Sequence, residues 1–282
     1  MTNFFEYIKS NASFAKLSFD ELLFAEYTCP IKEKKLPIWA DANYVAYVLS
    51  GKKIWSEGGV SYELKEGDAI FVSKGAHYIE QIMDKEFCLL IFFLPDEFLE
   101  EIILNTKYSK QKDFKEIQKL IQVDVNEPLQ IYFHSMASII AQKQNPSKEL
   151  LSLKFKELIL QLINYQKDPA LMKFFSSFAA SPERRFRLLI ESNLQYNLSI
   201  DEYASIVGMS VSTFKRFFKQ VYGNSPGQYI LDKRLSYAAM LLKKTEKNVQ
   251  EIAYESGFEN PTHFNRSFGK KFKVPPLKYR SS

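Results

Sequence analysis

The chain has 282 residues, 46% of them hydrophobic and 25% charged, a composition typical of a folded globular protein with one or two domains. Its longest apolar run, at 87–95, has the length of a buried strand and excludes a membrane-spanning helix. Because Cys29 and Cys88 lack metal or redox spacing and no secretory signal opens the chain, we expect a protein of the reducing cytoplasm.

Positive charge is concentrated in the last third of the chain. From Pro182 onward there are 17 Lys and Arg residues against 9 Asp and Glu, whereas the first 181 residues carry 21 basic and 24 acidic residues. This asymmetry predicts an anionic partner for the carboxyl-terminal part. Charge alone does not distinguish a nucleic acid from a membrane surface.

Residues from about 36 to 95 have the pattern of short strands. Runs rich in β-branched and aromatic residues are separated by turns that contain glycine, and they lie at 44–49, 52–56, 61–64, 69–72 and 78–82. Strands at this spacing predict a small antiparallel barrel or sandwich.

From Asp96 the apolar residues follow a helical period. The segments with this period are 96–106, 113–121, 128–144 and 147–166. The last of them carries a broad apolar stripe, formed by Leu150, Leu151, Leu153, Phe155, Leu158, Ile159, Leu162 and Ile163. We expect this stripe to pack on its own sheet and also on a second copy, which predicts a homodimer through helices near 128–166. Strands and helices together define an amino-terminal domain, 1–166.

Residues 167–181 combine a proline and small residues with no clear amphipathic period, which predicts a linker. Ser181 and Pro182 then form a helix-start pair, because serine caps a helix and proline suits its first position. A second, all-helical domain is expected over 182–282.

This second domain repeats one pattern, a short helix, a glycine and a second helix, at 199–223 and 248–272. Gly208 and Gly257 stand where a helix-turn-helix needs a tight turn. Capping signals mark the helix starts, namely Ser199 with Glu202, Asn248 with Glu251, Ser225 with Pro226, and Asn260 with Pro261.

Helical phase divides the second helix of each copy into two faces. The aromatic face is predicted to pack in the core, and it holds Phe214, Phe217, Phe218, Val221 and Tyr222 in the first copy and Phe264, Phe268 and Phe272 in the second. The opposite face holds Ser212, Lys215, Arg216 and Lys219, then Thr262, Asn265, Arg266 and Lys270. If only one helix had such a polar and basic face, exposure to solvent would explain it. Two of them, with Arg at matching positions, favour DNA recognition.

The spacing of the two copies fits the same interpretation. A helix over 226–243 would be about 27 Å long, and it could hold two recognition helices about 34 Å apart, one turn of B-DNA. Hydroxyl, amide, imidazole and guanidinium groups would then reach base edges. Lys219, Lys270, Lys271 and the helix amino termini would hold phosphates.

The segment IAYESGFENPTHFNRSFGKKFKVPPLKYR, at 252–280, resembles the signature of AraC/XylS-type transcription regulators. The resemblance covers 182–282 and implies two helix-turn-helix motifs joined by a linker helix, in a bacterial cytoplasmic activator that binds promoters and touches RNA polymerase. It implies DNA contacts from Ser212, Thr213, Lys215 and Arg216, and from Thr262, His263, Asn265 and Arg266. A phosphate or water contact is the alternative for His263. Lys273 departs from the glycine usual at its position.

YELKEGDAIFVSKGAHY, at 62–78, is similar to the second half of a cupin motif, which implies a cupin-like sensor barrel. Metal-dependent cupins use clustered histidines. Here His77, His134 and His263 stand apart, so we expect no metal, no cofactor and no catalytic residue. The domain also resembles in part the activators of type III secretion operons, whose sensor halves are controlled by partner proteins. A small-molecule or protein effector is left open.

We therefore expect a two-domain α+β protein, with a cupin-like antiparallel β-barrel and following helices before an all-α DNA-binding domain. The predicted function is sequence-specific regulation of transcription, by activation, through helices near 210–222 and 260–272. It is not an enzyme in this interpretation and has no membrane partner. Two alternatives remain: a cupin-type metal enzyme with a fused helical domain, and a nonspecific architectural DNA binder.

Overall fold

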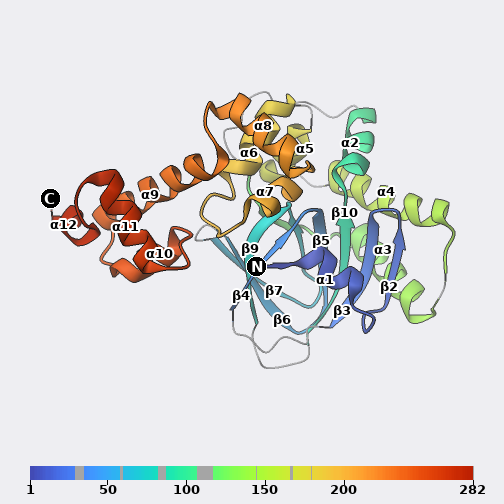
Figure 1. The fold of residues 1–282 in the computed structure, drawn as a ribbon. Helices are drawn as coiled ribbons and strands as arrows, with labels where there is room; N and C mark the ends of the chain where they lie inside the picture. Colours follow the sequence, from blue (N-terminus) through green and yellow to red (C-terminus); the bar gives the residue numbers. More distant parts are fainter. Residues whose placement is uncertain are drawn as a thin grey trace. The chain divides into compact units, whose positions relative to one another are not determined.

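The computed structural model describes residues 1–28, 35–57, 60–81, 87–106, 117–143, 145–165, 168–178 and 180–281 (Figure 1). The chain divides into two compact units, Met1–Leu188 and Leu189–Ser282. Of the expected elements discussed above, positions 82, 113–116, 144, 166, 167 and 179 lie outside the described ranges, as does Cys29. Within those ranges, no helix has both the length and the apolar character needed to cross a membrane.

The strands of the first unit form two sheets, in the orders β1-β4-β9-β6-β7 and β11-β8-β5-β10-β3-β2. Neighbouring strands run antiparallel, except for the parallel pair β1 and β4. Their bounds are β1 Thr2–Asn3, β2 Lys16–Phe19, β3 Leu22–Thr28, β4 Lys35–Ala40, β5 Asn43–Ser50, β6 Lys52–Glu57, β7 Val60–Lys65, β8 Ala69–Val72, β9 Gly75–Gln81, β10 Cys88–Leu94 and β11 Leu120–Val123.

The strand spacing predicted an antiparallel barrel or sandwich, and the described strands lie in two separate sheets that do not form a closed barrel. Strand β10 shows how the layers are arranged. Leu89, Ile91 and Phe93 pack between the two sheets, whereas Leu90 and Phe92 pack on the opposite face, against helices. A strand buried on both faces reads as a continuous apolar run, and each of its faces needs a covering layer.

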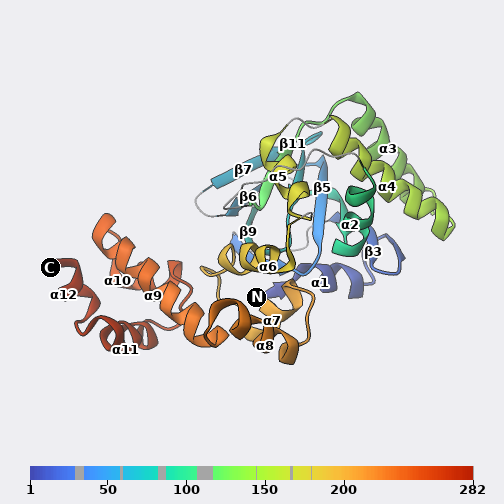
Figure 2. The same ribbon diagram turned by 90° about the horizontal axis from the view of Figure 1, so that it is seen from above.

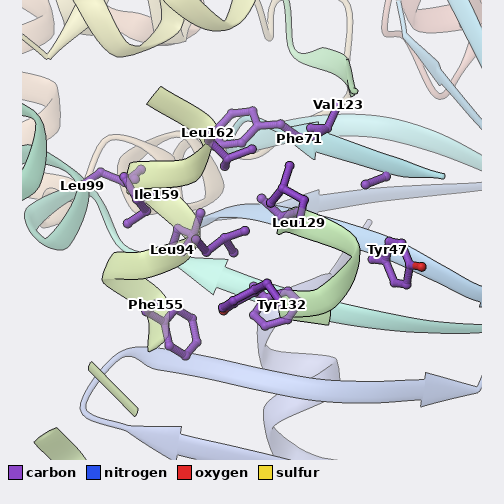
Figure 3. Packing of buried hydrophobic residues seen from close by; sticks show 14 of the residues in the cluster. Tyr47, Phe71, Leu94, Leu99, Val123, Leu129, Tyr132, Phe155, Ile159 and Leu162 are labelled. Atoms are coloured by element: carbon purple, nitrogen blue, oxygen red, sulfur yellow. The ribbon is translucent and has the colours of Figure 1, made fainter. Parts of the chain in front are cut away.

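Helices cover the outer face of the six-stranded sheet. They are α2 Asp96–Asn105, α3 Glu127–Ala141, α4 Lys148–Tyr165 and α5 Pro169–Ser177, while α1 Phe4–Ser10 joins the core between the sheets. Figure 3 shows Leu162 of α4 beside Phe71 of the sheet, with Leu129 of α3 and Ile159 of α4 in the same cluster. The expected packing of the α4 stripe on its own sheet is therefore present.

The predicted helix at 113–121 is wrong for its described part. Leu120–Val123 forms strand β11, which pairs antiparallel with β8. Leu120 is buried between the sheets, whereas the next residue, Ile121, is buried on the helix-covered face. Two successive apolar residues on opposite faces are a strand arrangement, and a segment this short carries too few positions for its period to be distinguished.

The predicted linker contains a helix that belongs to the first unit. In α5, Leu171, Phe174 and Phe175 are buried in the core under the helices, and Asp168 caps the helix by accepting the Ala170 N–H at 2.6 Å. The chain divides after Leu188 and not within 167–181. The small residues beside this short apolar stripe hide its helical period in the sequence.

The second unit is built around one long helix. The helices that follow α5 are α6 Pro182–Glu191, α7 Ile200–Ile206, α8 Val211–Tyr222, α9 Pro226–Lys244, α10 Val249–Glu255, α11 Pro261–Phe272 and α12 Pro276–Ser281. Figure 2 shows α9 running between the α7–α8 pair and the helices α10 to α12. Both recognition helices pack on α9. The expected all-helical domain with two joined helix-turn-helix motifs is confirmed.

Candidate nucleic-acid interface

Each helix-turn-helix motif begins with the predicted capping box. At the start of α7, Ser199 Oγ accepts the Glu202 N–H at 3.2 Å, and Glu202 Oε2 accepts the Ser199 N–H at 2.7 Å. At the start of α10, Asn248 Oδ1 and Glu251 Oε2 make the corresponding two bonds at 2.8 Å each. Two otherwise unpaired donors are satisfied at each start, which places both short helices at a defined residue.

The recognition helices α8 and α11 are also capped. Ser210 Oγ accepts the Thr213 N–H at 3.3 Å, and Asn260 Oδ1 accepts the Thr262 N–H at 2.7 Å. The sequence interpretation found Asn260 but missed Ser210. It also assigned a cap to Ser225, which occupies the N-cap position of α9 without a side-chain capping bond.

The turns inside the two motifs have the predicted backbone. Gly208 has φ 69° and Gly257 has φ 81°, both in the left-handed region that glycine adopts without strain. Ala204 and Ala253 are buried, which lets the two helices of each motif approach closely. Both motifs therefore set the second helix against the first in the same local way.

The aromatic faces of α8 and α11 have the same packing, 50 residues apart. The ring of Phe218 lies 5.5 Å from that of Tyr229 in the first turn of α9, and the ring of Phe268 lies 5.3 Å from that of Tyr279 in α12. Phe214, Phe218, Phe264 and Phe268 are fully buried. The first turn of α9 thus supports the first motif as α12 supports the second, and the expected inner face is confirmed.

The opposite faces of α8 and α11 are turned to solvent. The predicted contact residues there are exposed, namely Ser212, Lys215, Arg216 and Lys219 on α8, and Thr262, His263, Asn265, Arg266 and Lys270 on α11. Thr213 is half-buried and accepts a hydrogen bond from Ser210 Oγ at 3.0 Å. Over the described part of the chain, the cationic side chains on these two faces form no ion pair with a carboxylate. Their charge is not neutralised internally.

Lys271 differs from the other cationic residues of α11 because its side chain contacts another helix of the protein. Its Nζ donates to the Asp232 carbonyl at 2.6 Å and to Ser236 Oγ at 3.0 Å, and it lies 3.4 Å from the Asp232 carboxylate. This side chain joins α11 to α9. The sequence suggested a phosphate contact for Lys271, and the structure gives it an anchoring contact instead.

The histidine that suggested a cupin is enclosed in the first unit. His77 is fully buried, and its Nε2 lies 2.6 Å from the Tyr44 hydroxyl. Burial, aided by the Lys119 ammonium, lowers the pKa of His77 to about 3. His134 is exposed on α3. Among the described residues, no three His, Cys, Asp or Glu side chains gather as metal ligands would.

Known proteins resemble both parts of the chain. Residues 43–174 match the family model of the ExsA N-terminal regulatory domain, and residues 203–282 match that of a helix-turn-helix domain. The virulence regulon transcriptional activator VirF of Yersinia enterocolitica is 27% identical over 264 residues, which are 92% of this chain and 96% of VirF. The TetD protein of transposon Tn10 from Escherichia coli is 40% identical over 93 residues, 33% of this chain and 67% of TetD.

A crystal structure of ToxT from Vibrio cholerae O395 is similar at a TM-score of 0.40, with 15% identity, over 92% of this chain and 97% of ToxT. The carboxyl-terminal unit has the two helix-turn-helix motifs, the linker helix and the solvent-facing recognition helices of an AraC-type DNA-binding domain, and the sequence matches cover both units. The chain belongs to the AraC family of DNA-binding transcription regulators.

Proposed function

We propose that this protein activates transcription by placing α8 and α11 in two successive major grooves of a specific promoter site. The observation that carries the proposal is the duplicated recognition helix, which presents an exposed arginine, Arg216 or Arg266, in each copy. The 19 residues of α9 give a helix about 28 Å long. That length suits two recognition helices separated by one turn of B-DNA, about 34 Å.

The exposed side chains divide by chemistry into two roles. Arg216 and Arg266 carry guanidinium groups that pair with the O6 and N7 of guanine, and Asn265 suits adenine. Ser212, Thr213, Lys215, Thr262 and His263 lie in the first turns of the same helices and complete the base-reading set. Lys219 and Lys270, near the carboxyl ends, suit phosphates, which position the protein without reading sequence.

Activation requires a partner beyond DNA. VirF is described as a transcriptional activator and aligns with most of this chain, which supports activation. The partner proposed from the resemblance to AraC-type regulators is RNA polymerase, in the bacterial cytoplasm. The match to a regulatory domain at 43–174 supports control of the first unit by an effector. His77 and the apolar side chains around it are buried, and we favour a protein effector on the surface of this unit over a ligand inside the sandwich.

A homodimer through α3 and α4 is part of the same proposal. Six residues of the α4 stripe are buried in the first unit, but Leu150 and Leu153 are 46% and 62% exposed, and Ile131 of α3 is 62% exposed. Large aliphatic side chains at this exposure contribute more when a second copy covers them, because removing apolar area from water is favourable. The second copy would bring two more recognition helices to the promoter.

Footprinting on genomic fragments, followed by gel-shift titrations, tests the proposal. We expect Arg216→Ala and Arg266→Ala each to lose discrimination of about 1–3 kcal/mol at particular base pairs, in different halves of the site. Lys219→Ala should weaken binding to all sequences and lower the salt dependence by about one phosphate contact. Lys156→Ala, an exposed lysine on α4, is the control for loss of one charge.

Two results would contradict the proposal. Equal weakening on all sequences by both arginine variants would indicate a nonspecific architectural binder. Stoichiometric metal in the purified protein, together with no DNA binding, would support the metal-enzyme alternative.

A further inference from the structure

Arg234, near the middle of α9, hydrogen-bonds through a single side chain to the turn of the second helix-turn-helix motif and to the segment just before the first, which the Tyr203 hydroxyl of α7 holds by donating to the Asn193 carbonyl at 2.8 Å. Its Nε donates to the Leu194 carbonyl at 2.9 Å and one terminal nitrogen donates to the Tyr196 carbonyl, both in the segment that leads into α7. Its other terminal nitrogen donates to the Gly257 carbonyl at 3.1 Å, in the turn of the second motif. All three nitrogens of the planar guanidinium group are thus used on backbone carbonyls.

Two further contacts join the same segments. A Cβ placed on Gly257 would lie 2.9 Å from the Gln195 carbonyl and 3.0 Å from Arg234 Nε, so the turn of the second motif is in close contact with the approach to the first. The Asn197 amide also donates to the Glu259 carboxylate, across the same boundary. We call Arg234, Gly257 and the Asn197–Glu259 pair the inter-motif clamp.

The clamp is a connection that α9 alone does not supply. A helix sets the distance between the residues at its two ends, but each motif can still rotate as a body about its own contact with the helix. Three charge-assisted bonds from one rigid fork remove this freedom, because the guanidinium geometry fits all three carbonyls in one arrangement only. Arg234 is half-buried, which strengthens these bonds relative to solvent-exposed ones.

We propose that Arg234 is a positioning residue that fixes the relative orientation of α8 and α11, so that the protein accepts DNA sites of one half-site spacing. The preference for one half-site spacing rests on the proposed function, whereas the fixed orientation of α8 relative to α11 does not. One inserted base pair turns the second half-site by about 34° relative to the first. A clamped pair of recognition helices cannot follow that rotation, whereas an unclamped pair can.

The conformational part is tested without DNA, in the full-length chain with both cysteines replaced by serine. Spin labels at Gln220→Cys on α8 and Lys270→Cys on α11 occupy exposed positions. Double electron–electron resonance is expected to give one narrow distance distribution in the parent and one at least twofold wider in Arg234→Gln. Lys244→Gln, an exposed lysine on the same helix, is the charge-matched control and should leave the distribution narrow.

A glycine pair gives a second, independent comparison. Gly257→Ala and Gly208→Ala carry the same left-handed strain, but an added methyl collides with the clamp only at Gly257 and meets nothing within 4 Å at Gly208. Gly257→Ala should widen the distribution and Gly208→Ala should not. Arg234→Lys keeps the charge but has one nitrogen in place of three, so it should resemble Arg234→Gln.

The DNA part uses duplexes that the parent protein selects from a random pool, with zero or one base pair inserted between the half-sites. The parent should lose at least tenfold affinity on insertion, and Arg234→Gln about threefold or less. A variant that only weakened folding would lose affinity equally on both duplexes. If no specific duplex is selected, the proposed function fails. The distance distributions still test whether the inter-motif clamp fixes the orientation of α8 relative to α11. An unchanged narrow distribution in both Arg234→Gln and Gly257→Ala overturns the inference.

Discussion

Lys273 and Gly223 show how two different residues satisfy the same turn. Both follow a recognition helix, with φ of 63° and 70°, and both donate their backbone N–H to the residue four positions earlier at 2.9 Å. The departure from glycine at 273 therefore leaves the turn unchanged. Its effect is energetic, because the left-handed conformation costs a non-glycine residue roughly 1 kcal/mol.

We expect Lys273→Gly to stabilise the second unit by about 1 kcal/mol, and the matched variant Gly223→Lys to destabilise it by about the same amount. Urea denaturation followed by hydrogen exchange of amides in residues 189–282 measures both. Equal stability of Lys273→Gly and the parent would show that the lysine side chain makes compensating contacts.

His77 gives the first unit a stability that depends on pH. Because burial lowers its pKa to about 3, the folded state holds it neutral, whereas the unfolded state binds a proton below about 6.5. The unfolded state thus binds more protons between these values, and stability is lost as the pH falls through this range. From pH 7.5 to 5.5 the loss should be about 1.4 kcal/mol.

Urea denaturation of the first unit at these two pH values checks the prediction for His77. His77→Gln retains a hydrogen-bonding group for Tyr44 but does not titrate, so it should lose the pH dependence. A slope that is unchanged in His77→Gln would assign the effect to another group.

At the scale of the element, α4 shows that one apolar stripe can serve two surfaces. Leu151, Phe155 and Leu158 are buried in the first unit, whereas Leu150 and Leu153 point away from this core. The stripe is wider than a single sheet contact requires. This excess width is what the homodimer proposal uses.

Replacing Leu153 by Gln is expected to raise the homodimer dissociation constant about tenfold or more, because burying a leucine contributes about 1.5–3 kcal/mol. Sedimentation equilibrium measures the change, and Lys156→Gln is the control on an exposed position of the same helix. A dissociation constant that does not respond to Leu153→Gln, or to Ile131→Gln, would place the dimer contact elsewhere.

At the scale of the whole molecule, the end of the first unit is held by a buried ionic network. Asp96 accepts the Asn43 amide at 2.8 Å and pairs with Lys74 and, at 2.6 Å, with Arg185 of α6. Burial opposes its ionisation, but the two cations outweigh this effect and hold the pKa of Asp96 below its usual range. Arg185 lies in the part of α6 that belongs to the first unit, so this network holds α6 to α2 and to the sheet within that unit.

Removal of this carboxylate should therefore be costly. We expect Asp96→Ala to destabilise the first unit by about 3–5 kcal/mol, because Lys74 is left buried without a carboxylate and Arg185 keeps only its longer contact with Glu100, at 3.7 Å. Glu97→Ala removes an exposed carboxylate from the same turn of α2 and should have little effect. Thermal unfolding compares the two variants, and equal melting temperatures would contradict the structural role of the network.

The sequence by itself determined those features that depend on local physics. Three features follow from bonds within a few residues or from the helical period: the capping boxes, the left-handed glycines and the two faces of α8 and α11. The motifs, their exposed residues and the expected family could therefore be predicted from the sequence. Strands β5 to β9 could also be predicted, because short β-rich runs between turns that contain glycine are a local pattern. The departure from the family glycine at Lys273 could be seen in the sequence, whereas the structure shows that the turn there is the same as at Gly223.

Only the tertiary structure decided which surfaces these elements cover. The segment of strand β11 was predicted as a helix, and the segment of α5 as a linker. Their apolar stripes are too short to show a period, and only the sheet and core on which they pack define their structure. Both faces of β10 are buried because a second sheet lies on one side of its sheet and helices lie on the other. Lys271 and Arg234 look like any solvated cations in the sequence, and carbonyl groups at least 23 residues away give them their roles. Such long-range pairs are set by packing, and no local pattern records them.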